Sequence, residues 1–302
     1  MTRIAYFGPQ GTFTEQAARS LAEGEHVPYE SIGLTLAAVR KGETDAACVP
    51  VENSVEGPVT ATLDGLAEDE PLVAVAEALL PIHFSVLARP DVDPAEIGTV
   101  ASHPHALAQV QRWLAQHLPA ARHVAAASTA AAAVAVRDGE YDAAVVAPVA
   151  VEHYKLRTIA TDVADLPDAR TRFLLLRRPG VLPEPTGSDR TSVVAAAVNR
   201  TGALSELLTE LAFRGINLTR LDARPSKGGF GEYRFFIDFE GHIAEPRIGD
   251  ALAALRRRCH LRFLGSHPRA DGVRPSIRPA ASNEDFVSAA DWVESVRNGD
   301  TA

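Results

Sequence analysis

The sequence has little cysteine and no long apolar segment, and both shortages exclude classes of protein. Its two cysteines, Cys48 and Cys259, lie far apart and belong to no cluster with metal-ligand spacing, so neither a disulfide framework nor a metal site is predicted. No apolar run reaches the roughly 18 residues of a membrane-spanning helix. The chain opens on a strand-like segment rather than a signal peptide. These shortages predict a cytoplasmic protein without membrane association.

Basic residues are also in the minority. The 302 residues include 30 Lys and Arg against 39 Asp and Glu, which gives a formal net charge of −9. This balance argues against a general nucleic-acid-binding protein. It does not exclude an anionic substrate, because a site can be locally positive on an acidic protein. The length allows two domains.

Short apolar strands alternate with helices through the first part of the chain. Thr14 is the expected N-cap of the first helix. Because strands alternate with helices, the pattern predicts the α/β class, with a parallel or mixed sheet covered on both faces. The strands are expected at residues 3–7, 45–51, 99–102, 123–127, 143–146 and 173–176, and the helices at 15–23, 34–41 and 130–137.

A segment rich in proline and glycine, residues 179–189, reads as a linker after a first domain at 1–178. The following domain, residues 190–268, has the order strand, helix, strand, strand, helix, strand, which predicts a ferredoxin-like unit. A tail at 269–302 contains one helical pattern. The expected strands of the second domain are 191–198, 218–224, 231–239 and 261–264, its helices are 202–213 and 248–259, and the tail helix is 284–297.

The turn at residues 8–13, Gly-Pro-Gln-Gly-Thr-Phe, lies between the first strand and helix. It lacks the glycine spacing of a dinucleotide-binding loop and has no suitably placed acidic residue after it, so a dinucleotide cofactor is not expected. Two interpretations stay open. The turn has only a structural role, or Gly11 and Thr12 hold an anion at the helix N-terminus.

Hydroxyl residues follow two further strands. Ser102 is expected to cap a helix with Pro104 in its first turn, and Gln109 to lie two turns later on the same face. Ser128 and Thr129 repeat the capping pattern. Both places are interpreted either as simple helix caps or as parts of a ligand site. The histidines that flank Pro104 lack a third ligand nearby, so no metal is expected there.

Two more groups of polar residues stand at strand ends. Glu52 and Asn53 end a buried strand, where α/β proteins often bind ligands, although an asparagine can also simply hold a turn. Thr171 and Arg172 precede Phe173 and an apolar run. Arg172 has the geometry to clamp a carboxylate bidentately, the alternative being a surface salt bridge. No strong nucleophile is evident, so the chemistry should depend on positioning.

Taken in this order, these motifs resemble the bacterial monofunctional prephenate dehydratases. The resemblance covers the chain to about residue 268 and includes a C-terminal segment similar to an ACT regulatory domain. Gly202-Ala203-Leu204-Ser205 is similar to the G-A-L-V motif of that domain, and Asp222-Ala223-Arg224-Pro225 to its E-S-R-P motif. Ser205 departs from valine, and Asp222-Ala223 from Glu-Ser, both in the expected effector site.

The resemblance implies a two-lobed domain similar to periplasmic binding proteins, with a cleft in which prephenate becomes phenylpyruvate, carbon dioxide and water. It implies no cofactor. Thr171, Arg172, Asn53 and Glu52 would be catalytic, with Thr171 donating to the departing hydroxide. Substrate would be held by Gly11, Thr12, Ser102, Gln109, Ser128, Thr129 and Phe173.

The resemblance also implies feedback control by L-phenylalanine between paired ACT domains, in a homodimer or homotetramer. The effector would lie near Gly202, Ala203, Leu204, Asn217, Leu218 and Asp222. Two alternatives stay open: a cyclohexadienyl dehydratase that also accepts arogenate, and a non-catalytic small-molecule sensor.

Overall fold

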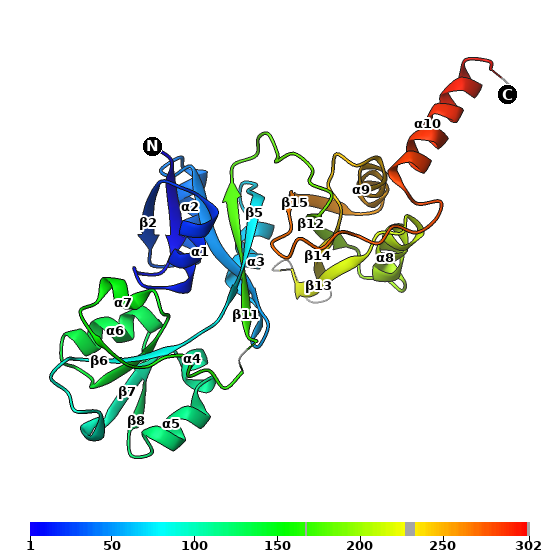
Figure 1. Ribbon diagram of the computed structural model, residues 1–302. Helices are drawn as coiled ribbons and strands as arrows, with labels where there is room; N and C mark the ends of the chain where they lie inside the picture. Colours follow the sequence, from blue (N-terminus) through cyan, green and yellow to red (C-terminus); the bar gives the residue numbers. More distant parts are fainter. Residues whose placement is uncertain (167, 227–232, 301–302) are drawn as a thin grey trace. The chain divides into compact units, whose positions relative to one another are not determined.

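The computed structural model describes residues 1–166, 168–226 and 233–300 (Figure 1). The chain forms two compact units. The first contains Met1–Gly65 and Glu77–Arg178, and the second contains Leu66–Ala76 and Pro179–Ala302. The sequence did not predict that a segment from within the first domain would group with the second.

The first lobe of the first unit is a mixed sheet with the strand order β5-β11-β3-β1-β2. β1 is parallel to β2 and β3, whereas β11 returns antiparallel to β3. The two-residue strand β4 pairs with the end of β3. The strands are β1 (Arg3–Phe7), β2 (Glu25–Tyr29), β3 (Ala46–Asn53), β4 (Gly57–Pro58), β5 (Val73–Pro81) and β11 (Arg170–Arg177), and the helices are α1 (Phe13–Leu21), α2 (Ile32–Arg40) and α3 (Thr60–Ala67).

The second lobe is a separate sheet with the order β10-β6-β9-β7-β8. Its central strands β9 and β7 are parallel, and β6 runs antiparallel to β9. The strands are β6 (Ser85–Ala88), β7 (Thr99–Ser102), β8 (Arg122–Ala125), β9 (Ala143–Val146) and β10 (Arg157–Ala160). The helices are α4 (Pro104–Ala108), α5 (Gln111–His117), α6 (Thr129–Arg137) and α7 (Ala150–His153), with a 3₁₀ turn at Pro94–Glu96.

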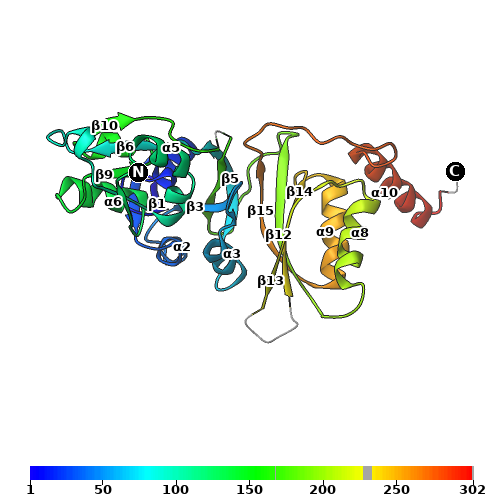
Figure 2. The ribbon, with the colours of Figure 1, turned by 90° about the horizontal axis from the view of Figure 1, so that it is seen from below.

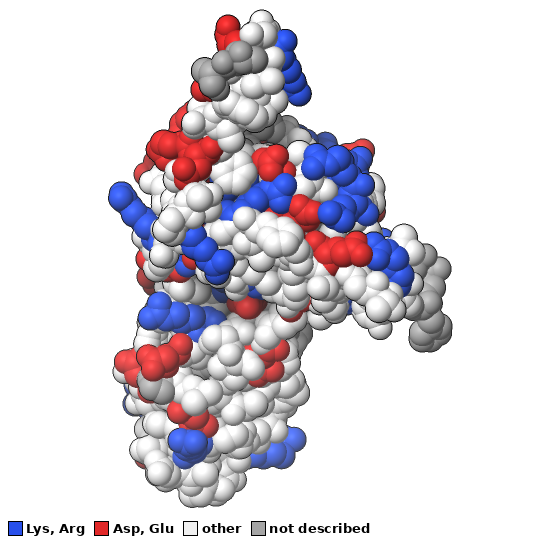
Figure 3. Space-filling model, turned by 90° about the vertical axis from the view of Figure 1, so that its right-hand side faces the viewer, with Lys and Arg blue, Asp and Glu red and all other residues white. Residues whose placement is uncertain are grey.

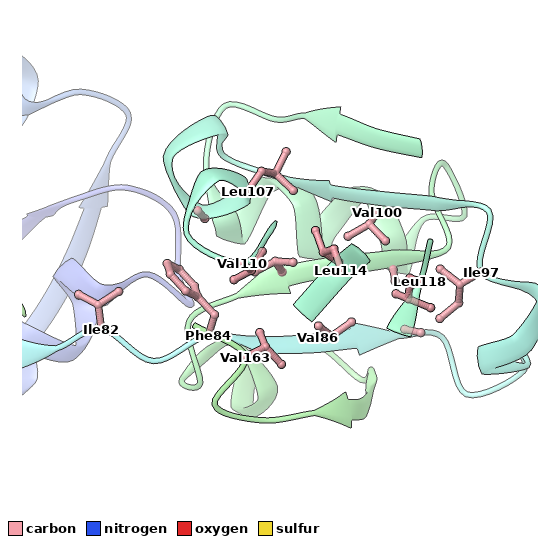
Figure 4. Close-up of a cluster of buried hydrophobic side chains, with 14 of the residues drawn as sticks. Ile82, Phe84, Val86, Ile97, Val100, Leu107, Val110, Leu114, Leu118 and Val163 are labelled. Carbon is pink, nitrogen blue, oxygen red and sulfur yellow. The ribbon is translucent and has the colours of Figure 1, made fainter. Parts of the chain in front are cut away.

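The core of the second lobe extends to the first lobe. Its buried cluster includes Phe84, Val100, Val110 and Leu114 (Figure 4), and Phe13 of α1 packs against it. The rings of Phe13 and Phe84 meet edge to face with centroids 5.7 Å apart, a favourable aromatic geometry. This contact links the start of α1 to the second lobe.

The chain crosses between the lobes twice, and the two crossings are hydrogen-bonded to each other. The Ile82 amide donates to the Ala169 carbonyl at 2.8 Å, and the Val163 amide donates to the Phe84 carbonyl at 3.1 Å. This is the two-lobed arrangement that the family resemblance implied.

The second unit has the predicted ferredoxin-like order, with the antiparallel sheet β13-β14-β12-β15. Helices α8 and α9 cover one face of this sheet (Figure 2), over a core that includes Leu211, Phe239 and Leu255. The elements are β12 (Asp189–Ala197), α8 (Ala203–Phe213), β13 (Leu218–Pro225), β14 (Tyr233–Glu240), α9 (Pro246–Arg258) and β15 (His260–Pro268). The first two residues of the strand predicted at 231–239 lie outside the described residues.

The early segment of this unit is held by β15. Arg262 donates through Nη1 to the carbonyls of Leu66, Glu68 and Asp69. Further along, Ala74 of β5 pairs with Gly265, whose φ is +135°. A Cβ at position 265 would lie 2.3 Å from the Ala74 carbonyl oxygen, so the two backbones approach as closely as only glycine allows.

The tail helix is α10 (Asn283–Arg297), as predicted, and it begins with a capping box between Ser282 and Asp285. Several boundaries were wrong by a few residues, and the strands β2, β4, β5, β6 and β10 and the helices α3, α5 and α7 were not predicted. The first N-cap was also wrong. It is Thr12 rather than Thr14, because the Thr12 hydroxyl accepts the Glu15 amide and α1 therefore starts at Phe13.

Candidate active site

Thr171 and Asn53 lie side by side because β11 and β3 pair antiparallel with these residues in register, as are Arg172 and Glu52. The Asn53 amide nitrogen donates to the Thr171 hydroxyl oxygen at 2.7 Å. The other end of this amide is fixed, since its Oδ1 accepts from the backbone amides of Val55 and Glu56 at 2.8 and 3.0 Å. The strand register thus joins two predicted catalytic residues that are distant in sequence.

This arrangement determines what Thr171 can offer to a ligand. Because the Thr171 oxygen already accepts a hydrogen bond from Asn53, its own hydrogen is free to point away from the amide. Thr171 is buried, so a donor there would act in surroundings with little competing water. The pair therefore forms an oriented hydrogen-bond donor rather than an acid that titrates.

Arg172 is buried next to two carboxylates. Its Nε lies 3.9 Å from Glu52 Oε2, and its Nη1 lies 3.7 Å from Glu77 Oε2. The surface salt bridge considered from the sequence is therefore wrong for Arg172. The register also shifts between Arg172 and Phe173, a β-bulge of the kind that re-aims side chains near functional sites. Phe173 itself is buried opposite Pro50, so its contact with substrate stays a prediction.

The glycine turn of the first lobe packs on α7 of the second. The Tyr154 hydroxyl donates to the Gln10 carbonyl at 2.7 Å. Gly11 has φ +86°, and a Cβ there would lie 2.9 Å from the Tyr154 ring and 3.1 Å from Cα of Ala150. Glycine is therefore required by both the backbone conformation and the close packing.

The helix N-terminus after this turn already has an anionic partner. The Gly11 amide donates to the buried Glu15 carboxylate at 2.6 Å, and the same carboxylate contacts Arg19 at 2.6 Å and His153 of the second lobe at 3.1 Å. Thr12 caps the helix with its oxygen and donates to the Pro9 carbonyl at 3.2 Å. An anion at Gly11 and Thr12 stays a prediction, and it would share this place with Glu15.

Ser102 and Gln109 lie differently from the expectation. The N-cap of α4 is His103, and Ser102 is the fully buried last residue of β7, where its hydroxyl donates to the Val145 carbonyl at 2.6 Å. The cap prediction for Ser102 was wrong because β7 continues through it. Gln109 follows the five-residue helix α4 as its C-cap, so the prediction of a shared face two turns on was also wrong. Its buried Oε1 has no hydrogen-bond partner among the described residues.

Ser128 caps α6, as predicted, by accepting the Ala131 amide at 2.9 Å, and Thr129 is the first residue of that helix. Both are half-buried. Their predicted contact with substrate is not tested by this geometry, because the capping role accounts for the serine without a ligand.

The histidines that flank Pro104 form an aromatic pair with centroids 4.9 Å apart. His105 lies 3.9 Å from Glu56 of the first lobe. Burial and the neighbouring His105 lower the pKa of His103, while Glu56 opposes this shift. Among the described residues, no group of three or more His, Cys, Asp or Glu side chains is arranged to hold a metal ion.

A pocket of about 320 Å³ lies in the second unit at the start of α8. Gly202, Ala203 and Leu204 line it, together with Tyr233 and Phe235 of β14. Asn217, Leu218 and Asp222 are not among its described lining residues. Asp222 instead pairs with Arg220 at 2.5 Å. The structure therefore brings together half of the predicted effector residues within one chain.

The surface of the protein carries charges of both signs. On the face drawn in Figure 3, basic and acidic side chains are interspersed, unlike the continuous basic surface typical of nucleic-acid-binding domains. Within the described ranges, no helix has the length and apolar character needed to cross a membrane.

Two buried carboxylates of the first unit were missed from the sequence. Glu15 stands three residues after Thr12, and this T-x-x-E spacing is a recognised capping signal. Glu77 is a lone charge inside the apolar strand β5. A charge in such a run is seldom buried without a partner, which is the signal that could have identified it.

Two parts of the chain match known families. Residues 4–180 match the family described as Prephenate dehydratase, and residues 191–257 match the family described as ACT domain. The two matches correspond to the two-lobed region and the ferredoxin-like region described above.

Similar proteins cover the whole chain. A protein of Amycolatopsis methanolica named prephenate dehydratase is 73% identical over 306 residues, covering 100% of both chains. A crystal structure of prephenate dehydratase from Arthrobacter aurescens in complex with L-Phe has a TM-score of 0.93 at 43% identity, covering 98% of this chain and 100% of that one. A structure of GqqA, described as a novel type of quorum quenching acylase, has a TM-score of 0.80 at 31% identity, with 88% and 97% covered.

Proposed function

The chain belongs to the prephenate dehydratase family, and we propose that the residues at the paired ends of β3 and β11 carry the activity. The reaction is that of a carbon–oxygen lyase, in which prephenate loses carbon dioxide and water and becomes phenylpyruvate. Phenylalanine regulates this step. The single observation that best supports the assignment is the Asn53 to Thr171 hydrogen bond.

Thr171 acts on the leaving hydroxide. When the ring carboxylate departs as carbon dioxide, the electron pair of the broken C–C bond enters the ring and expels the hydroxyl group on the opposite carbon as hydroxide, which takes up a proton from solvent to become water. Asn53 keeps the Thr171 oxygen occupied, so its hydrogen is directed at the developing negative charge. A threonine hydroxyl is too weak an acid to ionise, and its contribution is electrostatic stabilisation by a preorganised donor.

Arg172 binds the substrate carboxylate that does not leave. Its guanidinium matches a carboxylate in a way that a lysine does not, and its burial strengthens the interaction. Gln109 supplies a buried acceptor without a partner among the described residues, which suits a hydroxyl of the substrate. The remaining contacts with substrate are assigned to Gly11, Thr12, Ser102, Ser128, Thr129 and Phe173, with Glu52 near Arg172.

Phenylalanine binds in the pocket at the start of α8. The backbone after Gly202 holds the charged head group, and the ring packs against apolar neighbours such as Tyr233 and Phe235. Asn217, Leu218 and Asp222 would come from a second subunit, which requires a homodimer or homotetramer. The proposal keeps the protein in the cytoplasm.

The test is to mix purified protein with prephenate and follow phenylpyruvate by its absorbance, with and without phenylalanine. We expect turnover that phenylalanine reduces. A parallel reaction with arogenate, followed by phenylalanine release, decides whether the broader cyclohexadienyl dehydratase activity is present. Binding of prephenate without any phenylpyruvate would instead identify a sensor and overturn the catalytic assignment.

A further inference from the structure

Glu77 is a buried carboxylate beside the proposed substrate arginine. It lies on β5, its side chain is 2% exposed, and its Oε2 is 3.7 Å from Arg172 Nη1. A carboxylate that has lost its water is stable only when a positive or hydrogen-bonding partner remains next to it. Burial therefore favours Glu77 keeping Arg172 among its partners whether or not a ligand is bound.

Glu52 contacts the same guanidinium under different conditions. Its Oε2 lies 3.9 Å from Arg172 Nε, but its side chain is 41% exposed. Water can solvate this carboxylate if it turns away, so leaving the arginine costs it little. Arg172 is thus placed between one carboxylate that is buried and one that is partly exposed to water.

Building on the proposed function, we propose that substrate binds by carboxylate exchange on Arg172. Glu77 is a positioning residue that permanently holds the guanidinium, and a carboxylate of prephenate replaces Glu52. Because one carboxylate takes the place of another, the charge around the guanidinium does not change on binding. This resolves why a glutamate lies beside the site of a dianionic substrate.

The exchange predicts opposite effects for two isosteric substitutions. With Glu77→Gln, Glu52 becomes the stronger competitor for Arg172, so we expect the KM for prephenate to rise by about 10-fold with a smaller change in kcat. With Glu52→Gln, the competitor is gone, so the Kd of phenylpyruvate, used as a stable carboxylate probe, should fall by about 3-fold or more.

The double variant Glu52→Gln/Glu77→Gln separates positioning from a merely structural role. We expect it to recover most of the KM lost in Glu77→Gln, because no competing carboxylate remains at Glu52. Loss of packing at Glu77 would not be repaired by changing Glu52. Glu140→Gln, an exposed charge removal in the second lobe, is the matched control and should leave KM and Kd unchanged.

The outcomes are decisive in either direction. Unchanged KM in Glu77→Gln, or no recovery in the double variant, overturns the exchange. If thermal melting shows that Glu77→Gln does not fold, the Kd of phenylpyruvate for Glu52→Gln is the deciding measurement. Tighter binding than in wild type supports the exchange, and equal or weaker binding overturns it. Wild-type protein that forms no phenylpyruvate would contradict the proposed function itself. The comparisons between variants, by contrast, test only the exchange, because they are made on active enzyme.

Discussion

The candidate site of the first unit and the pocket of the second differ in how far their side chains are buried. The first relies on buried side chains, since Thr171, Arg172 and Glu77 are all nearly inaccessible to water. The second is an open pocket at the start of α8, where Arg200 has 55% of its side chain exposed and Tyr233 is also exposed. The first is formed by buried groups, whereas the second is open to solvent.

This difference teaches what each site is suited to do. Buried donors and charges are oriented before a ligand arrives, and this preorganisation is what stabilises charge that develops during a reaction. An exposed pocket has no such advantage, but its shape and affinity can change when another surface covers it. An effector site must bind two states of the protein unequally, and an incomplete pocket allows that.

The strongest test of the comparison removes the preorganised donor. We expect Thr171→Ala to lower kcat by on the order of 100-fold or more, because one oriented donor to developing charge is lost. Steady-state kinetics on prephenate measures this, and Thr171→Ser, which keeps a hydroxyl, should retain much more activity. Near-normal turnover in the alanine variant would remove Thr171 from the mechanism.

The next test changes the shape of a buried charge while keeping its sign. Arg172→Lys should raise the KM for prephenate by about 10-fold, because an ammonium cannot replace the two-pronged guanidinium. If KM and kcat were both unchanged, Arg172 would serve only the protein carboxylates around it. Thermal melting of the variant controls for loss of fold.

A third test addresses the open pocket. Ala203→Leu places three more carbon atoms in the pocket lining, so the phenylalanine concentration for half inhibition should rise by about 10-fold while uninhibited turnover is kept. Ala212→Leu, an exposed position on the same helix, is the matched control. Equal inhibition of both variants would place the effector elsewhere. Another way to remove the pocket would be to truncate the chain after Gly187. Point variants are preferable, because truncation would remove most of the unit with which Leu66–Ala76 groups.

The smallest expected effect concerns acid. The pKa of His103 is lowered from 6.5 by burial and by His105, so folding favours its neutral form. Its stabilising contribution is therefore present above that pH and is lost as the pH falls below it. The Tm of wild-type protein relative to His103→Asn, which keeps a capping acceptor, should fall by about 1–2 °C between pH 7.5 and 5.5. A constant difference would contradict this shift.

Much of the fold could be predicted from the sequence because its signals are local. β9 and α8 follow apolar patterns with clear glycine or hydroxyl boundaries. The strand β2 was missed because its pattern is partly exposed and contains Pro28, which speaks against a central strand. The short helix α4 was misjudged because Ser102 resembles a cap, yet its hydroxyl is used by β9.

The sequence named the residues of the candidate site, but it did not predict the contacts among them. A motif identifies Thr171 and Asn53, whereas only the register of β3 and β11 reveals that one donates to the other. Glu77 could not be connected with Arg172 from the sequence, because their meeting depends on β5 lying next to β11. Pairing between strands that are distant in sequence cannot be read from the local hydrophobic periodicity of either strand.

The close approach of Gly265 and Ala74 has a consequence for protein engineering. Ala74 is three residues before Glu77 on β5. A side chain at position 265 would therefore push on the strand that holds Glu77 next to Arg172. Gly272 also has positive φ, at +64°, but a Cβ there meets nothing, so an alanine at 272 is a control for a positive-φ glycine whose replacement causes no steric contact. We therefore expect a substitution at position 265 to displace Glu77 and so change substrate binding, although neither prephenate nor phenylalanine is expected to bind at this position.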